Sequence, residues 1–497
     1  MSTFPLTWSD KTFGPDGPWQ AVSVGIGTPA QTVALYPGGR WSSTILLSTI
    51  CDNQTSWSSL TTCYADDAGV FNRNKSGSAG RDAADSEGWK TWSDASSLSG
   101  WAGQSVFYDT FDIGLGTKVP NVSLTGLSDA YQEYPNGRNY PMEVGILSMG
   151  APSLTHIWGY TMVFIGSYLY KAASRRTPSY SYGIHIGSAK LGIPGSAWLG
   201  GYDRNRIMGE TSAQPFAPFT TNPGGNLVIG LQDIGLGVAT GGSPWSYSQK
   251  SGLLSGSNSS LTAPVTVELD FARPYLYLPP STCQNIASTL PVTFNPDLGL
   301  YFWNTDDDSY RKIVSSPAYL SFLFQKDSTN NKKFTIKVPF ALLNLTLESP
   351  LVSEETPYFP CYPSDNIYAL GRAFLQAAFV AEDFGTGDGY GTWFLAQAPG
   401  PGLVDVSDQA TIEASSSSIP TTGNSWEVSW DSHWTALPSS TNTSKTGNAG
   451  NTTANSDKNI SGSSELSQGA TIVSLGAKFE GICPWKVCAT YTGKMQL

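Results

Sequence analysis

The chain has 497 residues, with 28 Lys and Arg against 39 Asp and Glu, which gives a formal net charge of -11. Because this charge repels phosphate and no basic run offsets it, nucleic acids and anionic membrane surfaces are excluded as partners. The length exceeds what one hydrophobic core usually serves, so two lobes are expected. Only 13% of the residues are charged while 12% are aromatic, and 52 Gly and 32 Pro supply many turns. This composition predicts an all-β protein rather than a helical bundle.

Strand and turn patterns dominate the first four fifths of the chain. We treat residues 1–16 as an N-terminal extension, 17–190 as an N-terminal lobe and 191–408 as a C-terminal lobe, because short β-branched and aromatic runs alternate with Gly, Pro, Asn and Asp throughout. Helical periodicity is rare in this part. It predicts only short helices, at 280–290, 310–314 and 371–379.

The composition changes near residue 410. Residues 409–470 are rich in Ser, Thr, Asn and Gly, which predicts a disordered, glycosylated stalk. Within it, the aromatic segment SWEVSWDSHWTAL (425–437) is expected to pack on the body of the protein in preference to binding a partner. Residues 471–497 have modest hydrophobicity and no predicted role.

Cysteines and glycosylation signals favour the secretory pathway. The six cysteines suggest the disulfides Cys51–Cys63, Cys283–Cys361 and Cys483–Cys488, although spacing alone leaves the pairing open. An even count without a Cys/His cluster favours disulfides over zinc, and no metal or cofactor is expected. Eight Asn-X-Ser/Thr signals predict a secreted, cell-surface or cell-wall glycoprotein: Asn53, Asn74, Asn121, Asn258, Asn344, Asn442, Asn451 and Asn459.

Signals for membrane targeting are missing from the sequence as given. The residues after Met1 show neither a basic n-region nor an apolar h-region, so secretion would require a signal peptide that this sequence omits. No run of 18 apolar residues predicts a membrane span, and surface anchoring would belong to a fuller form of the protein.

Two segments of the chain echo each other. VALYPGGRW (33–41) and VELDFARPY (267–275) each carry a hydrophobic strand into a short loop and a further apolar run. Later in each half comes a triplet of two apolar residues and a small one, Ile146-Leu147-Ser148 and Ala369-Leu370-Gly371. We therefore expect one related half-site in each lobe.

On these motifs, residues 17 to 400 resemble the pepsin family of aspartic peptidases, and in particular its divergent secreted or surface members in fungi. The other motifs that carry the resemblance are GIGTPAQ (25–31), VFYDTFDIG (106–114), GILSMG (145–150), SAWLGGYD (196–203) and YALGRAFLQ (368–376). The resemblance implies a bilobal pepsin-like β fold in which the two half-sites meet at the floor of a peptide-binding cleft.

The half-sites depart from the family's Asp-Thr-Gly-Ser/Thr pattern. In such enzymes two carboxylates about 3 Å apart share one proton and activate a water. Here the first half-site reads Pro37-Gly38-Gly39-Arg40 and the second reads Asp270-Phe271-Ala272-Arg273, so only Asp270 is retained at a catalytic position. Proline also fixes φ and removes an N–H donor at that position. We expect Asp270 to pair with Arg273 as a structural carboxylate, so that the resemblance implies a peptidase scaffold without its catalytic pair.

Several side chains near the half-sites are candidates for a cleft. The position of the family's flap tyrosine falls near Ser97, and Trp101 is the substitute that we consider. Arg40 and Arg273 are expected to fill the vacant site with ion pairs in preference to binding a ligand, although their planar guanidinium groups would suit a carboxylate. Aromatic residues at strand spacing are more often core than cleft. The aromatic candidates beside the half-sites are Tyr36, Trp41 and Tyr275.

The sequence thus predicts a monomeric, catalytically inactive relative of the aspartic peptidases that binds a peptide, protein or glycan in its cleft. One alternative is an active acid peptidase in which Asp270 works with Asp109, Asp112 or Glu143 as the second carboxylate. Another is a cell-wall structural or adhesion protein, for which the glycosylation signals and the stalk argue. It predicts an occluded cleft.

Overall fold

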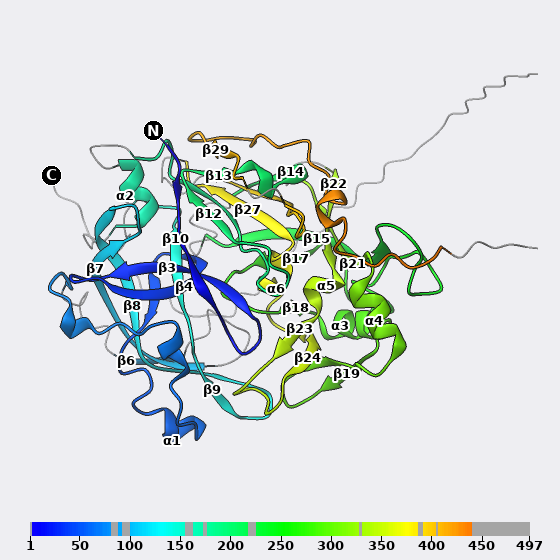
Figure 1. The fold of residues 1–497 in the computed structure, drawn as a ribbon, viewed down its shortest axis with the longest axis horizontal. Coiled ribbons are helices and arrows are strands. Elements are labelled where there is room, and N and C mark those ends of the chain that lie inside the picture. Colours follow the sequence, from blue (N-terminus) through cyan, green and yellow to red (C-terminus); the bar gives the residue numbers. More distant parts are fainter. Residues whose placement is uncertain are drawn as a thin grey trace, which may run out of the picture. The chain divides into compact units, whose positions relative to one another are not determined.

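The structure is a computed structural model that describes residues 2–80, 88–91, 100–154, 163–171, 176–216, 225–327, 331–385, 391–403 and 406–439, with backbone alone for 57, 88–91 and 100–104. The chain divides into two units, Met1–Ser440 and Thr441–Leu497. The second unit lies outside the described residues, so the fold below is that of the first unit (Figure 1).

Strands dominate the described residues, which confirms the all-β expectation. The α-helices there are short, and several of them begin within two residues of the end of a strand. Helices α3, α4 and α6 fall in the three segments where helices were predicted, and α6 ends early because strand β27 begins at Ala378. The bounds are α1 (Gln54–Ser58), α2 (Ile165–Lys171), α3 (Pro280–Ala287), α4 (Asp308–Ser315), α5 (Phe340–Leu343) and α6 (Arg372–Leu375).

The first half of the chain forms a nine-stranded sheet. Strand β4 has a continuous run of buried residues from Val33 to Pro37, so both faces of the sheet are covered at this strand. Along the sheet the strands are β2 (Trp8–Phe13), β3 (Trp19–Ile26), β4 (Gln31–Arg40), β10 (Gly145–Gly150), β5 (Ser43–Leu46), β8 (Lys118–Glu133), β7 (Gly100–Asp112) and β6 (Gly88–Thr91), with β9 (Asn139–Pro141) paired to β8.

The second half forms an eight-stranded and a four-stranded sheet. The larger has the order β22 (Lys333–Pro339), β21 (Ala318–Gln325), β15 (Leu227–Val238), β17 (Val265–Leu269), β26 (Ala369–Leu370), β18 (Leu276–Leu278) and β25 (Cys361–Pro363), with β16 (Gln249–Lys250) paired to β15. The smaller has the order β19 (Val292–Asn295), β20 (Leu300–Trp303), β24 (Thr356–Phe359) and β23 (Leu345–Leu347).

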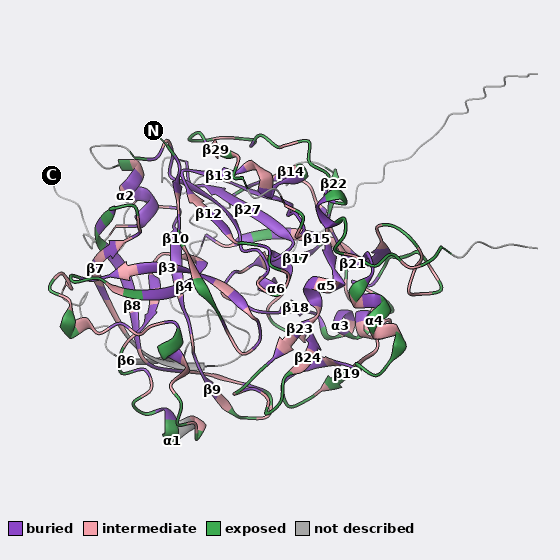
Figure 2. Ribbon diagram, in the orientation of Figure 1, coloured by how far each residue is buried: buried purple, intermediate pink, exposed green. Residues whose placement is uncertain are grey.

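A six-stranded sheet draws its strands from distant parts of the sequence. Its order is β1 (Phe4–Pro5), β12 (Ser196–Leu199), β11 (Ser181–His185), β27 (Ala378–Asp383), β28 (Thr392–Gln397) and β14 (Met208–Pro215). Every residue of β11 and β27 is buried, and Figure 2 shows β27 in the buried colour along its length. A sheet covered on both faces in this way ties the beginning, the middle and the end of the first unit together.

The two echo segments of the sequence occupy equivalent places in two sheets. In the first, β10 lies between β4, to which it is parallel, and β5, to which it is antiparallel. In the second, β26 lies between β17, again parallel, and β18, again antiparallel. The triplet beginning at Ile146 lies within β10, and the first two residues of the triplet beginning at Ala369 form β26. The repeat that the sequence predicts is therefore present in the topology.

Two boundaries of the sequence interpretation need correction. Residues 1–16 are not an extension, because β1 pairs with β12 and β2 pairs with β3. The stalk does not begin at 409, because β29 (Gln409–Thr411) pairs with β13 (Gly201–Asp203). Within 425–437, Trp426 and Trp430 are buried, as expected for an aromatic segment that packs on the body. The remainder of the predicted stalk, from 440, and the segment 471–497 lie outside the described residues.

Two predicted disulfides are confirmed, Cys51–Cys63 and Cys283–Cys361, while Cys483 and Cys488 lie outside the described residues. Among the described glycosylation signals, Asn53, Asn74 and Asn121 are exposed, whereas Asn258 and Asn344 are half-buried and take part in side-chain hydrogen bonds. Asn442, Asn451 and Asn459 are not described. None of the helices in the described part of the chain has the length and apolar character that crossing a membrane requires.

The Trp430 contact predicts that the aromatic segment contributes to the stability of the first unit. The indole is 1% exposed, stacks on Trp434 with ring centroids 5.0 Å apart and lies against Gly400. Trp430→Ala should therefore lower the free energy of unfolding by about 3–5 kcal/mol. Val428→Ala, in the same turn but 63% exposed, should change it by less than about 0.5 kcal/mol. Urea denaturation of both variants measures the difference; equal effects would show that the segment does not pack on the body.

Candidate functional site

The two half-site loops are in direct contact. Gly38 has φ +115°, and a Cβ built on it would lie 2.3 Å from Cγ of Phe271, whose side chain is 2% exposed. A side chain at position 38 would therefore meet both backbone strain and steric overlap. The place where the family's loops would present two carboxylates holds a buried phenyl ring against a glycine.

Asp270, the one retained acid, has both carboxylate oxygens occupied. Oδ2 accepts a hydrogen bond from Nε of Arg273 at 2.8 Å, and Oδ1 accepts one from the N–H of Ala272 at 2.9 Å. Arg273 has a side chain that is only 4% exposed, and its guanidinium lies 5.4 Å from the ring centroid of Tyr277. The ion pair that the three-residue spacing predicts is present, and it makes Asp270 a structural carboxylate.

Arg40 joins the two repeats. It lies at the end of β4, and its Nη1 is 3.2 Å from Oε1 of Glu268 on β17 and 3.4 Å from Oδ1 of Asn226, while Nη2 is 3.5 Å from the carbonyl oxygen of Leu269. Burial raises the pKa of Glu268, and the charge of Arg40 opposes that rise. As the sequence predicts for Arg40, this arginine forms an ion pair. The pair joins the first half-site to Glu268, which lies just before the second half-site.

A second carboxylate lies within the field of Arg40. Glu382 on β27 is 1% exposed and accepts a hydrogen bond from the hydroxyl of Tyr182. Burial raises its pKa to about 7, against the opposing charge of Arg40. The single guanidinium of Arg40 therefore acts on carboxylates of two different sheets.

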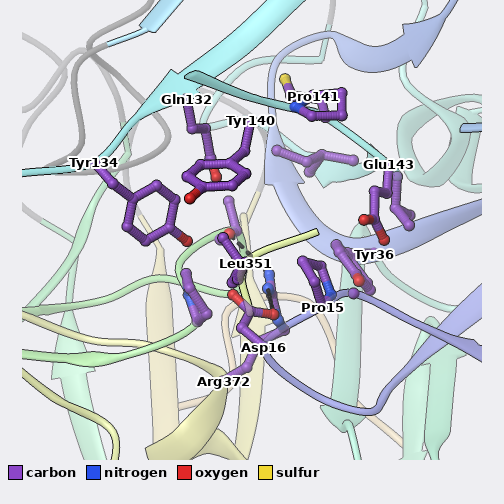
Figure 3. A pocket seen from close by; sticks show the side chains of 16 residues that line it. Pro15, Asp16, Tyr36, Gln132, Tyr134, Tyr140, Pro141, Glu143, Leu351 and Arg372 are labelled. Carbon is purple, nitrogen blue, oxygen red and sulfur yellow. Dashed lines mark hydrogen bonds and ion pairs between the residues drawn. The ribbon is translucent and has the colours of Figure 1, made fainter. Parts of the chain in front are cut away.

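A cavity of about 70 Å³ lies beside the half-site loops (Figure 3). Its walls come from both repeats, since Tyr36 and Ile146 belong to the first and Ala272 and Pro274 to the second. The other lining residues are Gly14, Pro15, Asp16, Gln132, Tyr134, Tyr140, Pro141, Met142, Glu143, Val144, Leu351 and Arg372.

Arg372 closes one side of this cavity. Its Nη1 donates hydrogen bonds to the carbonyl oxygens of Phe271 and Ala272, at 3.2 and 2.8 Å, and its guanidinium lies 4.2 Å from the ring centroid of Tyr36. Its Nη2 is 3.9 Å from Oδ1 of Asp16, an oxygen that also accepts the indole N–H of Trp19 at 2.7 Å. Arg372 thus connects the second half-site loop to the N-terminal strands.

In Figure 3, Glu143 lies beside Tyr36, on the side of the cavity away from Tyr134. Burial is the main reason that its pKa is raised to about 8, the charge of Asp16 adds to the rise, and a hydrogen bond from the backbone of Gly14 opposes it. Glu143 is therefore protonated at neutral pH while the cavity is empty. A protonated carboxyl group can donate a hydrogen bond as well as accept one.

A second cavity, of about 420 Å³, adjoins the first. Tyr140 and Leu351 line both, and the larger one is completed by Asn136, Arg138, Asn295, Asp297, Leu298, Phe302 and Val352. The two cavities therefore share part of their walls.

The aromatic candidates from the sequence have different positions. Tyr36 lines the cavity, as proposed. Trp41 packs edge-on against Phe164 with ring centroids 5.8 Å apart, and Tyr275 is fully buried in the core, where its hydroxyl lies 3.0 Å from that of Tyr134. Tyr275 is thus not a cleft residue. The backbone of Trp101 on β7 pairs with Tyr131, and its side chain is outside the description.

Sequence reasoning did not find Asp16 and Arg372. Asp16 was assigned to the N-terminal extension, and Arg372 was considered only as part of the motif YALGRAFLQ, without a role of its own. They are far apart in sequence and follow no periodic pattern, so no sequence signal joins them. The described residues contain no group of three or more His, Cys, Asp or Glu that could hold a metal ion.

The carboxylates considered as partners for Asp270 are used elsewhere. Oδ1 of Asp109 accepts hydrogen bonds from Ser78 Oγ and from the N–H of Thr110, both at 2.7 Å. Asp112 accepts the N–H of Gly114 at 3.1 Å. Glu143 lines the cavity, which Asp270 does not. This arrangement gives the active-peptidase alternative no support.

Comparison with known proteins gives no family assignment. No protein-family model matches the sequence, and no curated protein matches it. The interpretation of the site therefore depends on its own geometry.

The bridge made by Arg40 predicts a large effect on stability. Arg40→Met leaves Glu268 buried without its partner and should lower the free energy of unfolding by about 3–5 kcal/mol at pH 7. Lys11→Met is the matched control, because Lys11 forms an ion pair with Asp67 at 3.5 Å but both side chains are more than half exposed. The control should cost less than about 1 kcal/mol. Denaturant titration distinguishes the two, and similar losses would show that the Arg40 bridge does not join the repeats.

Proposed function

We propose that the protein is a secreted, pepsin-like protein without peptidase activity, which binds a ligand in the cavities beside its half-site loops. The repeated topology supports the pepsin-like part of this proposal. In both repeats a middle strand that carries an apolar triplet runs parallel to one neighbour and antiparallel to the other, directly beside a half-site loop.

The observation that carries the proposal is the state of Asp270. Acid proteolysis of the pepsin type needs two carboxylates that share a proton and hold a water between them. Both oxygens of Asp270 are hydrogen-bonded, and Gly38 of the other half-site loop lies against the ring of Phe271. No second carboxylate shares those hydrogen bonds, which supports the absence of pepsin-type catalysis.

The cavities support binding as the remaining use of this region. Their walls combine tyrosine rings with a few polar groups, which is typical of sites that hold small parts of a ligand. A purely structural cell-wall role, in contrast, would not need the open space that the two cavities provide. Confirmed disulfides and exposed glycosylation signals support placement of the protein in the secretory pathway.

Incubation of the purified protein with a diverse peptide library at pH 3 to 6 tests the absence of activity, with cleavage products measured by mass spectrometry. We expect no products from the parent or from Asp270→Asn, because neither has a pair of carboxylates. Pepsin in the same library is the positive control. Retention of peptides by immobilised parent protein, measured in parallel, should show binding without turnover.

Two outcomes would contradict the proposal. Cleavage by the parent that disappears in Asp270→Asn would show that an unconventional partner restores the catalytic pair. Absence of both cleavage and retention would remove the binding function and favour a structural role.

A further inference from the structure

The smaller cavity has the size of a terminal chemical group rather than of a whole residue. Its volume is about 70 Å³, whereas a cavity needs at least about 10–15 Å³ to hold one water molecule. Tyr36, Tyr134 and Tyr140 supply aromatic surface, and Asp16 and Glu143 supply carboxyl groups. A ligand group of a few heavy atoms in this cavity would therefore contact both aromatic rings and carboxyl groups.

The charges around Glu143 make this wall acidic. The charges with the largest effect on its carboxyl group are those of Asp16, Asp67 and Glu348, all of which oppose its ionisation. Arg372 is the cation that lines the cavity, and it is engaged by Asp16, by the carbonyl groups of Phe271 and Ala272, and by the ring of Tyr36. The net electrostatic field at Glu143 consequently favours a positively charged ligand group there.

One atom of Glu143 is left without a partner. Its Oε1 is buried and has no hydrogen-bond partner among the described residues. The hydrogen bond from the backbone of Gly14 therefore does not satisfy this oxygen. A buried polar atom without a partner costs free energy unless a ligand or water satisfies it. An arriving donor with a positive charge would satisfy both the orphaned oxygen and the acidic field.

We propose that the smaller cavity binds a primary ammonium group, the end of a lysine side chain of a peptide, with Glu143 as its ion-pair partner and tyrosine rings around its last methylene groups. This inference rests on the proposed binding function and names its ligand chemistry. Cations are attracted to the faces of aromatic rings, and a compact ammonium group has three donors for carboxyl and hydroxyl oxygens. The adjoining 420 Å³ cavity has room for the neighbouring peptide residues.

The proposal has a consequence for pH dependence. An ammonium guest favours the carboxylate form of Glu143, so binding at neutral pH releases the proton that the empty cavity holds. The affinity for the ammonium group should then rise with pH up to about 8, the pKa of Glu143 without a ligand. The reason is that the fraction of Glu143 that is protonated, and must lose its proton on binding, falls as the pH rises. Asp16, Arg372, Tyr36, Tyr134 and Tyr140 are the other titratable groups on the walls. A lysine amine keeps its charge over this range, since its pKa is near 10.4.

Isothermal titration calorimetry at pH 6.5 and 7.5 tests the inference with three blocked tripeptides, Ala-Lys-Ala and its norleucine and acetyl-lysine counterparts. The lysine peptide should bind several-fold to tenfold more tightly at the higher pH, and the two uncharged peptides should bind at least tenfold more weakly. Glu143→Gln should weaken binding of the lysine peptide at least tenfold and abolish its pH dependence. Glutamine is nearly isosteric with protonated glutamate, so this variant should still fold. Glu355→Gln, at an exposed position that lines neither cavity and is not among the charges that act on Glu143, should retain the affinity and the pH dependence.

The outcomes separate this inference from the function on which it rests. Equal binding of the norleucine peptide, or binding of the lysine peptide that is unchanged in Glu143→Gln, overturns the ammonium site while leaving peptide binding intact. If no peptide of the wider library is retained by the protein, the proposed binding function itself fails.

Discussion

The contact between Gly38 and the ring of Phe271 is the constraint on which the centre of this protein depends. At this point the loops of two topologically equivalent repeats approach so closely that a Cβ at position 38 would overlap the ring. Interiors are close-packed, so a phenyl ring here excludes both a second side chain and an ordered water between the loops. The same contact thus joins the repeats and removes the space in which a pair of carboxylates would work.

Three arginines complete this arrangement. Arg40 reaches from the first repeat to Glu268, Arg273 holds Asp270, and Arg372 holds the carbonyl groups of the second loop while it approaches Asp16. Each guanidinium has carboxylate or carbonyl partners, as burial of such a charge requires. In this region between the two repeats, each buried guanidinium therefore has carboxylate or carbonyl oxygens close to it. Glu143 differs from these carboxylates, because burial and the charge of Asp16 oppose its ionisation and its Oε1 has no hydrogen-bond partner among the described residues.

The sequence predicted those parts of the fold that follow from local patterns. Alternation and turn residues predicted the strands, the echo of 33–41 and 267–275 predicted the repeat, and the three-residue spacing predicted the pair of Asp270 with Arg273. It did not predict β29, because three polar and small residues beside a Ser-rich segment have no strand periodicity. Nor did it predict the approach of Arg372 to Asp16, since pairing across most of the chain length is fixed by packing alone. Tyr275 failed as a cleft candidate because its ring is needed in the core.

A double-mutant cycle between Gly38→Ala and Phe271→Ala tests the closed contact most directly, with unfolding free energies measured in urea. If the loops meet as described, alanine at position 38 costs much less when the phenyl ring has already been removed, because only the backbone strain at φ +115° remains. We predict a coupling free energy of at least about 1 kcal/mol between the two positions. Additive effects, within about 0.5 kcal/mol, would show that the two loops do not touch and would contradict the account of two repeats joined by this packed contact.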